Sequence, residues 1–212
     1  MENKNTACFV KAWKELHDGV NTRVEAVDVK LDLDKHYSES ERHYHNLTHI
    51  TQGLDELDLI RSYLQEPAEV EIAWWFHDSV YDSKAKDNEE RSAELAFERL
   101  SESGIDSSRI LRINNLILAT KHNKTPAFND EMFLVDVDLS ILGRSPQEFR
   151  KYEESIREEY SWVSEEQFRI GRKTILESFV RRPVIYSTEF FRDKYEERAR
   201  KNLVSSIRLL TD

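Results

Sequence analysis

The sequence predicts an all-α protein, a bundle of about nine or ten helices. Few residues break helices, since only 5 of the 212 are Gly and 4 are Pro. Charged residues make up 34% of the chain, and the Glu, Lys and Arg among them are good helix formers. Apolar residues also recur three and four positions apart over most of the length, as on a helix that buries one face.

Two helices are expected before the first histidine cluster. Residues 5–18 place Phe9 and Trp13 on one apolar stripe and predict the first helix. Residues 20–33 predict a second helix, or a helix plus a turn. The polar residues 37–42 are expected to form a loop that leads into the histidines.

Two further helices meet at Pro67. Apolar residues at helical spacing from Asn46 predict a helix of about five turns that ends near Pro67, because the residue before a proline disfavours the helical conformation. Pro67 suits the first position of the next helix, which runs to about Phe76. Residues 72–76 are apolar almost all round, which is typical of a helix at the centre of a domain.

The second half of the chain continues this alternation of helix and loop. Asp87 is interpreted as an N-cap that shares a capping box with Glu90, and their helix is expected to end near Gly104. Further helices are expected at residues 107–118, 130–142, 146–160, 164–180 and 188–210. No repeat, low-complexity segment or linker interrupts the sequence, so we expect one domain over residues 1–212. Its core, about residues 37–143, carries the candidate site, and the helices of residues 146–210 are expected to pack on that core.

Composition argues against several classes of protein. A net charge of −10 argues against a broad nucleic-acid-binding surface, so we expect no nucleic acid polymer as a partner. Cys8 is the only cysteine, which rules out an intrachain disulfide and a thiol-rich zinc site. The first residues show no signal-peptide pattern, and no stretch approaches the ~18 apolar residues of a membrane helix. We therefore expect a cytoplasmic protein with no membrane partner.

Histidines and aspartates gather in residues 43–82, where four of the seven histidines lie. His45 and His49 are four residues apart, so on a helix they share one face. The pair His77-Asp78 ends an apolar run, and burying such groups is costly unless a partner or a metal satisfies them. A single histidine here is as readily a capping or solvated residue. Histidines together with carboxylates favour a divalent-metal site in which some coordination positions of the ion stay open for water or substrate.

Asp136 and Asp138 are the two candidates for a later carboxylate ligand. On a helical wheel Asp138 lies with Leu134 and Ile141, on the apolar stripe that should face inward, whereas Asp136 points nearly opposite. A carboxylate on the inward stripe needs a partner, so Asp138 is the predicted ligand. A surface or capping role is the alternative.

The order His, His-Asp and Asp on consecutive helices resembles the HD superfamily of metal-dependent phosphohydrolases. The resemblance covers residues 45–138, and residues 168–172 and 181–186 are similar to a bacterial family of predicted HD phosphohydrolases. It implies an HD-domain-like bundle in which a divalent ion is bound by four side chains, those of His49, His77, Asp78 and Asp138.

Two groups of enzymes within this superfamily imply catalytic roles. Residues 44–49 are similar to a segment of cyclic nucleotide phosphodiesterases whose first histidine protonates the leaving group, which implies that His45 is the general acid. The spacing from His77-Asp78 to Asp82 resembles that of guanosine tetraphosphate hydrolases, with Tyr81 where those enzymes have Glu. Asp82 is accordingly expected to position the water or to hold a second ion.

The resemblance implies hydrolysis of a phosphate ester or phosphoanhydride in a small phosphorylated metabolite, with a nucleotide expected, by metal-activated water. The divalent ion could be Mn, Mg, Fe, Co, Ni or Zn, and a homodimer is left open. Four residues are expected to bind substrate, namely Lys121, His122, Arg172 and Arg181. Helix capping for the first two and surface ion pairs for the arginines are the alternatives. A non-catalytic regulatory protein that binds metal or nucleotide on an HD fold is the alternative function.

Overall fold

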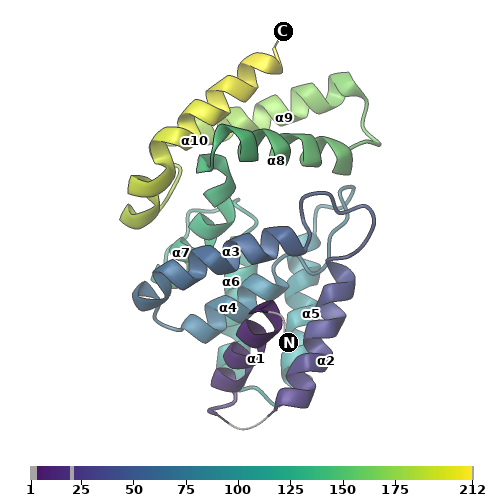
Figure 1. Cartoon of the computed structure of the whole chain (residues 1–212), viewed down its shortest axis with the longest axis vertical. Helices are drawn as coiled ribbons and strands as arrows, with labels where there is room; N and C mark the ends of the chain where they lie inside the picture. The colour runs from purple at the N-terminus through teal and green to yellow at the C-terminus, as the bar shows by residue number, and fades with distance from the viewer. Residues whose placement is uncertain (1–3, 20–21, 212) are drawn as a thin grey trace. The chain divides into compact units, whose positions relative to one another are not determined.

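The computed structural model describes residues 4–19 and 22–211, and within these ranges it contains ten α-helices, two 3-10 helices and no strand (Figure 1). The all-α prediction is confirmed. Most helices begin and end within a few residues of their predicted limits, although residues 20 and 21 of the second predicted helix lie outside the described residues. No helix in the described ranges is both long and apolar enough to cross a membrane.

The chain is grouped into two compact units, Met1–Val135 and Asp136–Asp212. The boundary falls inside one continuous helix, α7 (Asn129–Asp138). The expectation of a single domain stays a prediction.

The first unit is built around α4 (Pro67–Phe76), which packs against α1, α3, α5 and α6 (Figure 1). Its other elements are α1 (Lys4–Leu16), α2 (Arg23–His36), α3 (Leu47–Ile60), η1 (Arg61–Tyr63), α5 (Asn88–Glu102) and α6 (Ser107–Ala119). All α4 residues from Glu69 to Phe76 are buried, which confirms that this helix lies at the centre of its unit.

The turn between α3 and α4 differs from its prediction. The helix that was expected to reach Pro67 ends at Ile60, and the 3-10 helix η1 continues the chain to Tyr63. The main-chain N–H groups of Gln65 and Glu66 donate to the carboxylate of Asp130, at 2.8 and 2.9 Å. This carboxylate fixes the start of α4 to the first turn of α7.

The start of α5 also differs from its prediction. Asp87 is the N-cap residue, but its side chain accepts no capping hydrogen bond, so the expected capping box is wrong. The expected acidic partner, Glu90, instead forms an ion pair with Lys121. A complete capping box does occur at the start of α8 (Pro146–Glu159), between Ser145 and Glu148.

The buried carboxyl of Glu71 on α4 makes stability depend on pH. It accepts a hydrogen bond from Arg61 at 3.1 Å, and burial raises its pKa from 4.5 to about 7. A raised pKa means that the folded state binds the proton more tightly, so this stabilisation is complete below pH 4.5 and is lost as the pH rises through 7. We expect Glu71→Gln to gain stability relative to the wild type over this range, by up to about 3 kcal/mol at ~1.4 kcal/mol per pKa unit. Denaturant unfolding of both proteins at several pH values measures the difference, and a constant difference would contradict the prediction.

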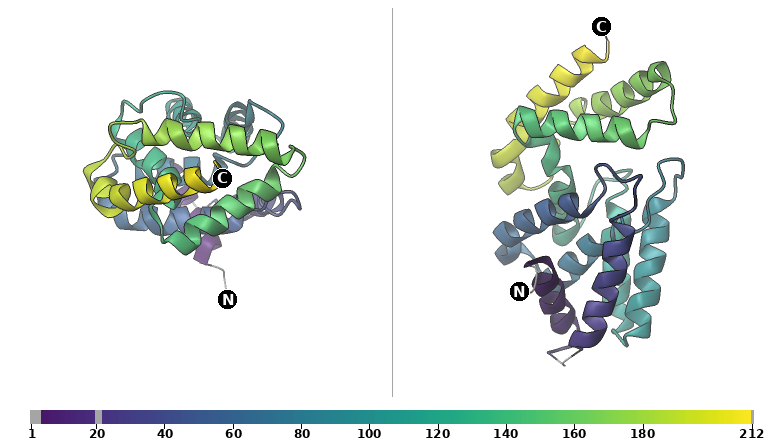
Figure 2. Two further views of the ribbon diagram at one scale, coloured as in Figure 1. Left: turned by 90° about the horizontal axis from the view of Figure 1, so that it is seen from above. Right: turned by 45° about the vertical axis from the view of Figure 1, so that its right-hand side comes forward.

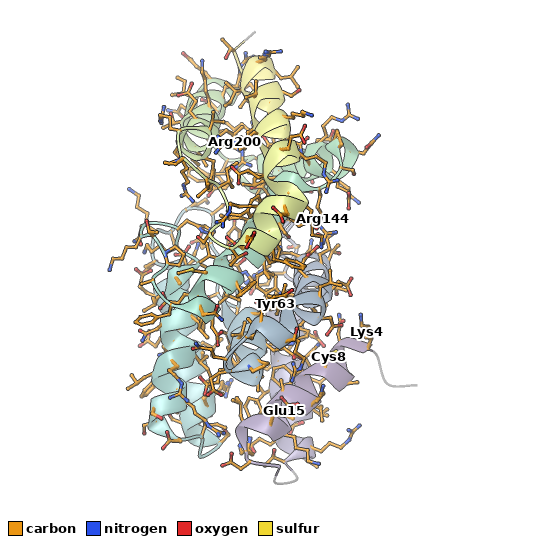
Figure 3. All side chains as sticks on the ribbon, turned by 90° about the vertical axis from the view of Figure 1, so that its left-hand side faces the viewer. Lys4, Cys8, Glu15, Tyr63, Arg144 and Arg200 are labelled. Carbon is orange, nitrogen blue, oxygen red and sulfur yellow. The ribbon has the colours of Figure 1, made fainter. Side chains whose placement is uncertain are left out.

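The second unit is held together by α10 (Glu189–Leu209), which packs against η2 (Leu139–Gly143) and α9 (Glu165–Val180) (Figure 2). Gly143 permits a close approach, because a Cβ there would lie 2.4 Å from Cβ of Tyr195. Arg200 lies on α10 and is labelled in Figure 3. It donates to the carbonyls of Val180, Arg182 and Pro183, at 3.2, 2.9 and 2.9 Å. These bonds attach the turn after α9 to α10.

Candidate metal centre

Three side chains of the first unit converge in a buried cluster. The Nε2 atoms of His49, on α3, and His77, directly after α4, lie 3.2 Å apart. The Asp78 Oδ2 atom is 3.0 Å from Nε2 of His77 and 3.8 Å from Nε2 of His49. The two histidine side chains are 4% and 1% exposed, so the cluster presents two imidazoles and a carboxylate away from bulk water.

Asp138, the predicted fourth ligand, is the last residue of α7 and belongs to the second unit, where its side chain is half-buried. Its role as a metal ligand stays a prediction. The described residues of the first unit supply two imidazoles and one carboxylate that could hold a metal ion.

A close approach of α3 and α4 brings the two histidines together. Gly53 of α3 leaves room for the indole of Trp74, since a Cβ there would lie 2.0 Å from the Cζ2 atom of that ring. The indole stacks on His77 with ring centroids 4.2 Å apart, lies 4.9 Å from His49, and donates from Nε1 to the carbonyl of Ile50 at 2.9 Å. Trp74 therefore fixes the orientation of both imidazoles.

The hydrogen bonds of His77 fit a metal ligand. Its Nδ1 atom lies 2.7 Å from the carbonyl oxygen of Trp74. A carbonyl only accepts, so Nδ1 carries the proton and the lone pair of a neutral ring is on Nε2, the atom that faces His49 and Asp78. A main-chain carbonyl bound to the remote nitrogen is the usual partner of a metal-ligating histidine.

The charge of Asp78 also suits a ligand. Burial acts to raise the pKa of Asp78, but its electrostatic interactions with His77, His45 and His49 hold that pKa well below its usual range. The carboxyl is therefore ionised at neutral pH, as a metal ligand must be.

The burial of Asp136 contradicts the helical-wheel argument that favoured Asp138 over Asp136. The helical wheel predicts that Asp136 points outward, but its side chain is fully buried and that of Asp138 is half-buried. The Asp136 carboxylate accepts hydrogen bonds from the N–H of Ser187 at 2.8 Å and from the N–H and hydroxyl of Thr188, both at 2.7 Å. The wheel failed because α7 ends at Asp138 and the chain continues as the 3-10 helix η2, so no single helix spans the residues compared.

His45 lies beside the cluster but not on the helix of His49. Asn46 is the N-cap of α3 and accepts a hydrogen bond from the N–H of Thr48 at 2.8 Å, so the expectation that both histidines share one helix face is wrong. The ring centroids of His45 and His49 are nevertheless 6.1 Å apart. The His45 ring stacks on Tyr81 at 4.2 Å, and this places an imidazole next to the candidate ligands.

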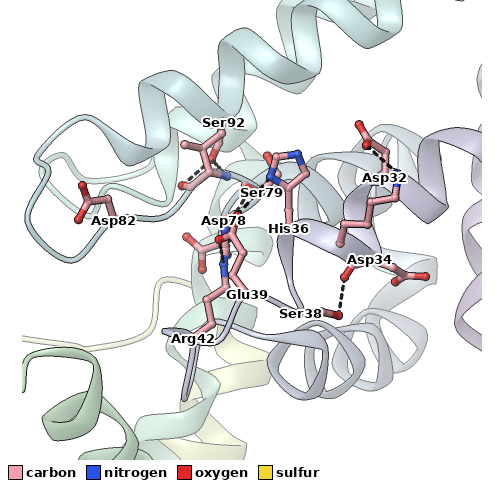
Figure 4. A network of polar contacts seen from close by, with 12 residues as sticks. Asp32, Asp34, His36, Ser38, Glu39, Arg42, Asp78, Ser79, Asp82 and Ser92 are labelled. Atoms are coloured by element: carbon pink, nitrogen blue, oxygen red, sulfur yellow. Dashed lines mark hydrogen bonds and ion pairs between the residues drawn. The ribbon is translucent and has the colours of Figure 1, made fainter.

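The loop that follows Asp78 is held by side chains at successive residues (Figure 4). Arg42 donates to the carbonyls of Asp78 and Ser79, at 2.6 and 3.0 Å. The Ser92 hydroxyl accepts from the N–H of Val80 at 3.0 Å and donates to its carbonyl at 3.3 Å. These contacts fix the chain directly after the ligand pair.

Asp82, the predicted water-positioning residue, is exposed on the same loop (Figure 4). Its Oδ1 atom accepts from the N–H of Lys84 at 2.8 Å. Its main-chain N–H and carbonyl both bond to the side chain of Asn88, each at 3.0 Å. The structure thus gives Asp82 a role in shaping the loop, and its catalytic role stays a prediction.

The four predicted substrate-binding residues have structural partners or special backbone geometry. Lys121 donates to the carbonyl of Lys86 at 2.9 Å and pairs with Glu90, and His122 has a φ of 55° just after α6. In the second unit, Arg172 is buried and bonds from Nε to Glu153 at 3.1 Å, and exposed Arg181 pairs with Glu177 at 3.2 Å. Substrate binding by these residues stays a prediction.

Ser92, whose hydroxyl bonds to both the N–H and the carbonyl of Val80, was not assigned a role from the sequence. Asn88 and Ser92 are four residues apart on α5, and this spacing is the one signal that both could face the same loop. Glu89 lies between them, half-buried. Burial raises the pKa of Glu89, and the negative charge of Asp78 adds to this, which indicates that the carboxyl lies within the electrostatic reach of the cluster.

Comparison with known proteins adds no relative: no family model, no curated protein and no solved structure matches the chain. The resemblance to the HD superfamily stays a prediction.

Proposed function

We propose that this protein is a metal-dependent phosphohydrolase that cleaves a phosphate ester or phosphoanhydride in a small phosphorylated metabolite, most simply a nucleotide. The observation that carries the proposal is the convergence of His49, His77 and Asp78 in one buried cluster. The fourth predicted ligand, Asp138, belongs to the second unit, and its role stays a prediction. His45 supports hydrolysis over a purely structural metal, because an imidazole beside the cluster can donate a proton near neutral pH.

The residues of the site have separate roles in the proposed hydrolysis. A divalent ion in this cluster supplies positive charge for a phosphoryl oxygen and lowers the pKa of water toward ~7. His45 donates a proton to the leaving oxygen, and its stacking on Tyr81 limits the motion of its ring. The hydrogen bond from His77 to the Trp74 carbonyl keeps the lone pair of the imidazole on Nε2, facing His49 and Asp78, where these residues would hold the ion.

The donor set narrows the choice of ion. Imidazole nitrogens suit Mn, Fe, Co, Ni and Zn better than they suit Mg or Ca, which prefer all-oxygen sites. We therefore propose a first-row transition ion in preference to Mg²⁺.

Removing the metal is expected to abolish hydrolysis. Wild-type protein that is stripped with a chelator should lose activity against nucleoside mono-, di- and triphosphates and p-nitrophenyl phosphate. Adding Mn²⁺, Co²⁺ or Ni²⁺ should restore it, with elemental analysis of each sample measuring the bound ion. Hydrolysis that persists in metal-free protein would exclude the proposal, as would a protein that binds no divalent ion under any of these conditions.

A second candidate is a non-catalytic regulatory protein that binds a metal or a nucleotide. The exposed position of Asp82 favours it, because its carboxylate bonds within its own loop and is not fixed for positioning water. Metal-loaded protein that binds a nucleotide in calorimetry, yet hydrolyses none of the compounds above, would favour this candidate.

A further inference from the structure

Arg42 is a buried cation that contacts two separate segments of the candidate metal centre. Its side chain is 1% exposed. Its Nη1 atom donates to the carbonyl of His45 at 3.2 Å and to the carbonyl of Asp78 at 2.6 Å. One nitrogen therefore connects the segment that carries His45 to the segment that carries His77 and Asp78. Its Nη2 atom donates to the carbonyl of Ser79 at 3.0 Å, and Figure 4 shows Arg42 beside this turn.

The contacts of Arg42 match the planar fork of a guanidinium. Its Nε atom donates to the carboxylate of Glu39 at 2.9 Å, which leaves both terminal nitrogens for the carbonyls. The guanidinium also lies over the rings of Tyr37 and Tyr81, 5.2 and 5.6 Å from their centroids, and Tyr81 in turn stacks on His45. All three nitrogens are engaged within the protein, which argues against direct contact with a substrate phosphate.

We propose that Arg42 is a positioning residue that fixes the separation between the proton donor His45 and the metal ligands His77 and Asp78. The inference rests on the proposed function. The carbonyls it holds belong to His45 and Asp78 themselves, so any shift of the guanidinium moves both side chains. A lysine has one nitrogen on a flexible stem and cannot make the same set of bonds.

The test is Arg42→Lys, which keeps the charge and removes the fork. We expect the Kd for Mn²⁺, measured by calorimetry with the metal alone, to rise by about 10-fold or more, as for the loss of other residues that orient metal ligands. At saturating Mn²⁺ we expect kcat for a phosphate substrate to stay about 10-fold or more below the wild type, with KM changed less than about twofold, because His45 is displaced from the leaving oxygen.

Arg61→Lys is the matched control. Arg61 lies in the same unit and bridges the carboxylates of Glu15 and Glu71, at 2.7 and 3.1 Å, but none of its bonds reaches a residue of the metal centre. We expect its thermal stability to fall while its Kd for Mn²⁺ stays within about twofold of the wild type. A change in Kd as large as that of Arg42→Lys would show that general loss of stability, and not positioning, is being measured.

Glu39→Ala keeps the proposal testable if Arg42→Lys does not fold. Glu39 is 46% exposed and bonds only to Nε of the guanidinium, so we expect the variant to fold. We expect a rise in the Mn²⁺ Kd of about threefold or more. An unchanged Kd in this variant, or in folded Arg42→Lys, would overturn the positioning role. Wild-type protein that binds Mn²⁺ without hydrolysing any phosphate would instead overturn the proposed function alone, because the Kd comparison does not depend on turnover.

Discussion

Asp78→Ala is expected to abolish binding of the divalent ion and to lower kcat/KM for phosphate substrates by at least about a thousandfold, which corresponds to ~4 kcal/mol. The Asp78 carboxylate is within 3.0 Å of Nε2 of His77 and 3.8 Å of Nε2 of His49. Its removal leaves the two imidazoles without their adjacent anion. Elemental analysis of the purified variant and hydrolysis assays at matched protein concentration measure the two effects.

Asp58→Ala is the control for this substitution. Asp58 lies on α3, the helix that carries His49, but its side chain is 60% exposed and its nearest cation, Lys4, is 3.8 Å away. We expect this variant to keep its metal content and its activity, since exposed ion pairs contribute little. Asp78→Asn tests charge against shape, because the amide fills the same space without the negative charge. Full activity and a full complement of metal in Asp78→Ala would refute Asp78 as a ligand of the metal centre.

The helices around the candidate site were predictable because local signals determine them. Pro67 at the first position and the apolar run of residues 72–76 predict α4 with both of its limits, and residues 72–76 are buried as expected. The end of α3 was not predictable to the residue. Proline excludes the helical conformation just before it, but the chain leaves the α-helix at Ile60, where η1 begins, and Asp130, a residue distant in sequence, fixes the following turn.

The candidate ligands were predictable as residue types, but the contacts around them were not. The burial argument that selected Asp138 fails, because Asp136 is the more buried carboxylate of the two. The role of Arg42 depends on carbonyls of Asp78 and Ser79, 36 and 37 residues further along the chain. Every residue has a main-chain carbonyl, so the identities of Asp78 and Ser79 do not indicate that their carbonyls accept from Arg42. Neither periodicity nor composition predicts such a contact.

His45→Gln is expected to lower kcat by about 10²- to 10⁴-fold for a substrate with a poor leaving group, while the metal stays bound. The ring centroid of His45 is 6.1 Å from that of His49, which places His45 beside the candidate ligands but outside the cluster. A proton donor matters most when the leaving oxygen is strongly basic. With p-nitrophenyl phosphate, whose leaving group is stable as an anion, we therefore expect a decrease of less than about tenfold.

The comparison of leaving groups separates proton donation from metal binding. Loss of a metal ligand slows both substrates alike, whereas loss of the proton donor slows chiefly the substrate with the more basic leaving oxygen. His43→Gln is the matched control, because its side chain is exposed two residues before His45, and its carbonyl, which accepts from Asn46 at 2.9 Å, is kept in the variant. Equal losses for both substrates in His45→Gln would assign His45 to the metal. No loss for either substrate would leave the proton to come from water, and the stacking of His45 on Tyr81 would then serve the packing of the loop.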